Sequence, residues 1–112
     1  MKIAFFGDIV GKTGRKKFES SLQQYVSDEK IDFVVANAEN ATAGAGLSAN
    51  HAEDLLKMSV DCITLGDHAY DNKEIIPFLG HTERVVRPIN YSDDCPGQGS
   101  HFLLYTSDAA DE

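Results

Sequence analysis

A chain of 112 residues, 42% of them hydrophobic, has the size of one small globular domain and too many apolar residues for a disordered segment. Its formal net charge of −8 excludes a general basic surface for a nucleic-acid backbone, because phosphate neutralisation dominates that kind of binding. No apolar run reaches the length of a signal-peptide core or a membrane span, so we expect a soluble cytoplasmic protein with no membrane partner.

The first half of the chain is expected to form two strands and two helices. Residues 2–6 and 31–36 are apolar runs that each end in polar residues, as buried parallel strands do. The segment after Gly14 has apolar residues at helical spacing, and a further helix is expected to begin after Ser48, a suitable N-cap. The apolar positions of these two helices are Phe18, Leu22, Tyr25, Val26, Ala49, Ala52, Leu55, Leu56 and Met58.

The second half continues the same alternation with shorter elements. A third strand is expected at residues 62–65 and a third helix from residue 72 or 73 to residue 79. Residues 85 and 86 are expected to form a fourth strand. Strands that alternate with helices predict an α/β fold with a mostly parallel sheet and right-handed crossovers.

Polar side chains follow the ends of three predicted strands. Asp8 follows the first strand, Glu39 and Asn40 follow the second, and the pair Asp67–His68 follows the third. In an open α/β sheet, ligands bind outside the carboxyl ends of the strands, so these side chains are expected at one edge. Carboxylate and amide oxygens are ligands for hard divalent ions such as Mn²⁺, Mg²⁺ or Fe²⁺. The pattern therefore indicates a metal site, in which Glu39 is suited to bridge two ions.

Each of these polar segments also has an ordinary structural interpretation. Asp8 and Asp67 are suited to capping helices, and the segment 39–40 is suited to a turn. For any one segment the two interpretations have about equal weight. Three strand ends with metal-type ligands favour the metal site.

Several longer motifs occur together and in a fixed order along the chain. They are Gly7-Asp8-Ile9-Val10-Gly11, Asn37-Ala38-Glu39-Asn40-Ala41, Gly44-Ala45-Gly46-Leu47, Thr64-Leu65-Gly66-Asp67-His68, Asp71, Lys73-Glu74-Ile75, Arg87-Pro88-Ile89-Asn90-Tyr91 and Pro96-Gly97-Gln98-Gly99. In this order the sequence resembles the YmdB-like branch of the calcineurin-type metallophosphoesterases, over about residues 1–100. The resemblance implies a four-layer αββα sandwich and a pair of divalent ions, either Mn²⁺, Fe²⁺/Fe³⁺ or Mg²⁺. It also implies hydrolysis of phosphodiesters, with 2′,3′-cyclic nucleotides as substrates.

The resemblance also implies roles for individual residues. It implies that His68 is the catalytic histidine, and we expect His68 to protonate the leaving oxygen. Asn90 and Tyr91 are expected to line the substrate pocket, with a packing role as the equal alternative. The implied metal ligands are Asp8, Glu39, Asn40 and the position of Asp67.

The chain departs from the family pattern in two respects. Asp67 stands where the family usually has asparagine, and the extra negative charge is expected to hold metal more tightly. The family draws three further metal-binding histidines from a second half that is absent here. Residues 1–102 are therefore interpreted as the N-terminal half of the domain with about half the sheet, and the uncovered apolar surface favours homo-oligomers.

The end of the chain has a different character. Residues 103–112 depart from the family and resemble the peptide produced when sequencing-adapter DNA is translated, so they are interpreted as a non-family tail from a truncated reading frame. The alternative is a natural strand at residues 102–105 with a short acidic tail.

The remaining histidines and cysteines match no family ligand. His51, His81 and His101 are expected on the solvated surface. Cys62 and Cys95 lack the spacing of a zinc site or a disulfide framework and are expected to be reduced.

Two other functions are alternatives to the phosphodiesterase. Residues 7–13 nearly match the P-loop of NTPases, but a P-loop has four residues between its glycines and only three separate Gly7 from Gly11. Lys12 is therefore interpreted as a solvated loop lysine. The second alternative is a non-catalytic metal- or nucleotide-binding module that binds one ion and turns nothing over.

Overall fold

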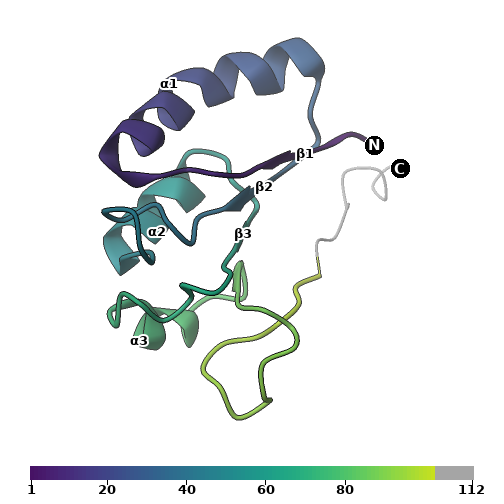
Figure 1. Ribbon diagram of the computed structural model, residues 1–112. Helices are drawn as coiled ribbons and strands as arrows, with labels where there is room; N and C mark the ends of the chain where they lie inside the picture. Colours follow the sequence, from purple (N-terminus) through teal and green to yellow (C-terminus); the bar gives the residue numbers. More distant parts are fainter. Residues whose placement is uncertain (103–112) are drawn as a thin grey trace.

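The fold is a single parallel sheet with helical crossovers, seen in a computed structural model that describes residues 1–102 (Figure 1). The strands are β1 (Ile3–Phe6), β2 (Phe33–Asn37), β3 (Cys62–Thr64) and β4 (Val85–Val86). They lie in the order β1-β2-β3-β4, and every neighbouring pair is parallel. The predicted α/β class is confirmed.

Three helices connect the strands: α1 (Gly11–Glu29), α2 (Ala49–Lys57) and α3 (Ile75–Leu79). The Ser48 hydroxyl accepts a hydrogen bond from the His51 backbone N–H at 3.1 Å, which confirms Ser48 as the N-cap of α2. The predicted start of the first helix was wrong, because Gly14 lies inside α1. The third helix begins at Ile75, two or three residues later than predicted, after turns that the Asn72 side chain supports by accepting from the Glu74 N–H.

The helices bury one face of the sheet. The side chains of Val34, Ala36 and Ile63 lie on this face. The register of β2 and β3 places Ala36 beside Ile63. The core cluster joins them to residues of all three helices, which include Phe18, Leu22, Ala52, Leu55, Ile75 and Leu79. Burial of this apolar surface, at roughly 25 cal/mol per Å², is the main stabilising contribution.

The opposite face of the sheet carries exposed apolar side chains. Ile3 and Phe5 of the edge strand β1 are 58% and 63% exposed, whereas Ala4 between them is buried. This alternation follows from the two-residue period of a strand. The apolar surface expected on this half-sheet is therefore present on β1.

No helix within residues 1–102 is both long enough and apolar enough to cross a membrane. Cys62 and Cys95 are free thiols, as predicted. The interpretation of residues 103–112 as a non-family tail, and the alternative strand at 102–105, concern a segment that lies outside the described residues.

Candidate active site

The loops that follow β1, β2 and β3 are joined by backbone hydrogen bonds. The Gly11 N–H donates to the Asn40 carbonyl at 3.1 Å, which ties the start of α1 to the loop after β2. The Ala38 N–H donates to the Thr64 carbonyl at 3.0 Å, which ties that loop to the end of β3. The predicted convergence of the strand ends at one sheet edge therefore has a direct structural basis.

Asp8 lies at the end of β1 in an unusual backbone conformation. Its φ of 62° is in the left-handed region, which glycine, asparagine and aspartate adopt more readily than other residues. The side chain is exposed. The N-cap of α1 is Val10, with no side-chain cap bond, so the interpretation of Asp8 as a helix cap was wrong. Strained conformations of this kind cost about 1–3 kcal/mol and cluster at functional sites.

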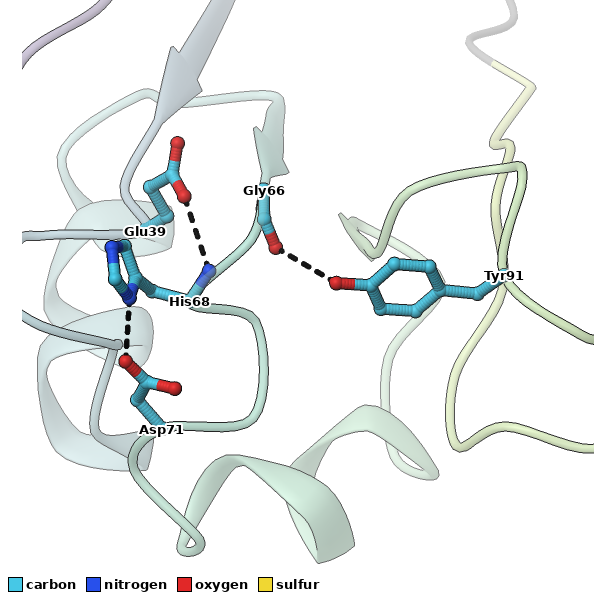
Figure 2. A network of polar contacts seen from close by, with 5 residues as sticks. All are labelled: Glu39, Gly66, His68, Asp71 and Tyr91. Atoms are coloured by element: carbon cyan, nitrogen blue, oxygen red, sulfur yellow. Dashed lines mark hydrogen bonds and ion pairs between the residues drawn. The ribbon is translucent and has the colours of Figure 1, made fainter.

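Glu39 reaches from the loop after β2 to the loop after β3. Its carboxylate accepts a hydrogen bond from the His68 backbone N–H at 3.2 Å (Figure 2). A Cβ atom at Gly66 would lie 2.5 Å from Oε1 of Glu39, closer than van der Waals contact permits. Gly66 is therefore the residue that makes room for the carboxylate at this edge.

The imidazole of His68 is oriented by a carboxylate. Its Nδ1 atom lies 2.6 Å from Oδ2 of Asp71, three residues later, and the ring itself is exposed (Figure 2). The hydrogen bond to Asp71 raises the pKa of His68, and the charges of Asp71, Glu39 and Asp67 raise it further. With Nδ1 held by Asp71, Nε2 is the ring atom left to exchange a proton with a ligand.

Asp71 is the site residue that the sequence interpretation missed. It was noted only as part of a matching motif, although its spacing from His68 was a usable signal. The turn at residues 66–71 brings the two side chains together, because the Ala69 N–H donates to Gly66 and the Asp71 N–H donates to His68.

The remaining predicted metal ligands occupy the same edge without direct bonds to this cluster. Asn40 is half-buried, and its carbonyl holds the Gly11 N–H. Asp67 is exposed and acts on His68 through its charge. Within residues 1–102, no three His, Cys, Asp or Glu side chains lie close enough together to hold one ion.

The predicted substrate-pocket residues behave differently from each other. The Tyr91 hydroxyl donates to the Gly66 carbonyl at 3.4 Å, which places it beside the turn that carries His68 (Figure 2). Its ring also packs against Tyr70, with the ring centres 5.9 Å apart. Asn90 is exposed.

Two backbone N–H groups at the start of α1, beside the P-loop-like segment, donate within the protein. The Gly11 N–H donates to Asn40, and the Gly14 N–H donates to the Val10 carbonyl. These donors are therefore engaged by the protein backbone itself. The Gly11 N–H is not available to a phosphate, which counts against the NTPase alternative together with the short glycine spacing.

His51 was wrongly expected on the solvated surface. It is half-buried in α2, and its Nδ1 atom lies 2.7 Å from the Thr42 hydroxyl. Burial lowers the pKa of His51, and the Arg15 guanidinium lowers it further. His81 is exposed, as predicted, whereas His101 is half-buried.

Comparison with known proteins identifies the family of this chain. The sequence profile described as "YmdB-like protein" matches residues 4–110. The chain belongs to the YmdB-like family. A Bacillus subtilis relative named 2′,3′-cyclic-nucleotide 2′-phosphodiesterase is 36% identical over 103 residues, which cover 92% of this chain and 39% of the relative.

Two solved structures share the YmdB-like fold. A protein from Thermus thermophilus is 38% identical with a TM-score of 0.84, over 93% of this chain and 40% of that chain. A phosphatase from Mycoplasma pneumoniae is 36% identical with a TM-score of 0.86, over 94% of this chain and 39% of that chain. The names of these relatives support a hydrolase family. The chain spans about two fifths of the relatives' length, a share that is consistent with the predicted partial fold.

Proposed function

We propose that this YmdB-like chain carries one half of a metal-dependent phosphodiesterase site that acts on 2′,3′-cyclic nucleotides or similar small phosphodiesters. The observation that carries the proposal is the link between Glu39 and His68, in which the carboxylate proposed as a metal ligand accepts a hydrogen bond from the backbone N–H of the proposed catalytic histidine. The name of the Bacillus subtilis relative supports the substrate class.

The oxygen donors at the sheet edge have the ligand chemistry that hard divalent ions prefer, although the described residues do not gather three carboxylates at one point. Gly66 leaves a space that the Glu39 carboxylate fills, and carboxylate and amide oxygens suit Mn²⁺, Mg²⁺ or iron. Two bound ions would neutralise charge on the phosphoryl oxygens and lower the pKa of water. The residues proposed to hold them are Asp8, Glu39, Asn40 and Asp67.

His68 is proposed to act as a general acid. The carboxylate of Asp71 fixes the ring through Nδ1, and the raised pKa of His68 increases the fraction of protonated imidazole near neutral pH. Proton donation from Nε2 to the departing ribose oxygen follows from this orientation. Tyr91 is proposed to border the substrate at the same turn.

The test is hydrolysis of bis-p-nitrophenyl phosphate and 2′,3′-cyclic AMP by the purified 112-residue protein with added Mn²⁺, alongside a metal-content assay. His68→Ala is expected to lower turnover about 100-fold or more while metal content stays unchanged. His81→Ala is the matched control, because His81 is exposed and outside the site.

Two other outcomes would change the proposal. A parallel loss of metal and turnover in His68→Ala would make His68 a ligand. Metal binding without any metal-dependent hydrolysis by the parent protein would favour the non-catalytic binding module.

A further inference from the structure

A groove of about 530 Å³ lies between α1 and α2. Its charged lining consists of four cationic side chains and two carboxylates, and it contains none of the proposed metal ligands. The cationic side chains are Lys12, Arg15, Lys16 and Lys57, and the carboxylates are Glu19 and Asp54. The excess of positive charge is local, because the whole chain carries −8.

The lysines of the groove are free to take an external anion. Among residues 1–102, Lys12, Lys16 and Lys57 form no ion pair or hydrogen bond with the protein through their side chains. Glu19 and Asp54 likewise form no ion pair with them within this range. Ammonium groups gathered without protein partners repel one another, and a bound anion removes that repulsion.

Arg15 differs from the lysines because it is held in place. Its guanidinium donates a hydrogen bond to the Ala41 carbonyl in the loop after β2. The remaining N–H groups of the planar guanidinium are thereby set in one orientation. The groove therefore combines one positioned cation with three adaptable ones.

The groove also contains apolar surface. Met58 and His51 lie along the α2 side, over the buried side chain of Leu55. The lowered pKa of His51 favours its neutral imidazole, which adds little positive charge but gives a flat surface for packing. A volume of this size falls within the range of about 300–1,000 Å³ that is usual for small-ligand sites.

We propose that the groove between α1 and α2 is a binding site for a small ligand with two or more phosphate groups. Lys16, Lys57 and Arg15 contact the phosphates, and the apolar side of the groove accommodates an organic group where the ligand has one. This site is separate from the proposed phosphodiesterase site and does not require metal. Pyrophosphate and ADP both have two linked phosphate groups, and only ADP also carries a nucleoside.

The test is calorimetric titration of the 112-residue protein with pyrophosphate, ADP and adenosine in EDTA, which removes any contribution of metal. Lys16→Gln and Lys57→Gln are each expected to weaken pyrophosphate or ADP binding about fivefold. Lys17→Gln is the matched control, because it removes the same charge from an exposed residue of α1 that does not line the groove. The control is expected to bind within about twofold of the parent protein.

The titrations separate the outcomes. Tighter binding of ADP than of pyrophosphate would support the site with a nucleotide as its ligand, and equal or weaker binding of ADP would support it with the phosphates alone as the recognised group. Equal effects of all three lysine substitutions would overturn the proposal, because net charge alone would then explain binding. Absence of saturable binding by both phosphate ligands would also overturn it. Since EDTA is present throughout, either failure leaves the phosphodiesterase proposal untouched.

Discussion

The Nδ1 atom of His68 lies 2.6 Å from Oδ2 of Asp71, and both side chains belong to one tight turn after β3. The carboxylate stabilises the imidazolium form, so it raises the pKa of the histidine. Asp71 therefore sets the orientation of the His68 ring and favours its protonated form. Within residues 1–102, Asp71 forms no hydrogen bond with Glu39 or Asp67.

Asp71→Asn is expected to lower the pKa of His68 toward its usual value of 6.5, because an amide does not stabilise the imidazolium as a carboxylate does. The measurement is an NMR titration of the His68 ring in metal-free buffer. Asp28→Asn is the control, because this substitution removes the same charge at a residue that accepts a hydrogen bond from Gln24 on α1. An identical His68 pKa in the two variants would contradict the role of Asp71.

Gly66→Ala is expected to weaken Mn²⁺ binding about tenfold, because the added Cβ would lie 2.5 Å from Oε1 of Glu39 and displace the carboxylate. The displaced group is the end of a flexible side chain, so Tm is expected to fall by less than about 5 °C. Gly80→Ala is the control, with its nearest contact at 3.4 Å. Equal Mn²⁺ affinity in both variants, measured by calorimetry, would argue against Glu39 as a ligand.

Asp67→Asn, which introduces the residue that the resemblance implies at this position, is expected to lower metal affinity about tenfold through loss of a negative charge. Metal titration provides the measurement. Asp93→Asn serves as the charge-matched control on an exposed residue of the later loop. Unchanged affinity in Asp67→Asn would count against ligation by Asp67.

Gly46→Ala is expected to lower the free energy of unfolding by about 3 kcal/mol, because two costs combine. The residue has a φ of +83°, and a Cβ would lie 2.7 Å from the Asn72 backbone nitrogen. Gly44→Ala is the control: its φ is +86°, but nothing lies within 4 Å, so only the conformational cost of about 1 kcal/mol applies. Urea denaturation measures both, and equal losses would show that the contact with Asn72 contributes nothing.

The sequence allowed prediction of the elements whose cause is local. Apolar runs gave the four strands, and Ser48 marked the start of α2 because an N-cap acts on the N–H groups of the next turn. Boundaries were less accurate where the cause lies outside the element. The start of α1 was placed too late, since the Gly11 N–H is held by Asn40 of another loop.

The candidate site divides in the same way. Glu39 and His68 were identifiable because their residue types and motifs are visible along the chain. The environment of His51 was not, because its ring bonds to Thr42 in the preceding loop and the charge of Arg15 on another helix lowers its pKa. Nor could the sequence show that the Glu39 carboxylate lies close to Gly66, because these residues belong to loops that follow two different strands.

The sequence by itself determined the α/β alternation, the acidic charge and the polar residues that end each strand, since hydrophobic periodicity and residue type are properties of the chain. Only the tertiary structure decided which of those residues meet. Parallel pairing of β2 with β3 brings the Glu39 carboxylate to the His68 backbone, and packing of α1 beside α2 forms the cationic groove. Both depend on contacts between segments far apart in the chain, and such contacts are fixed by the packing of the whole core.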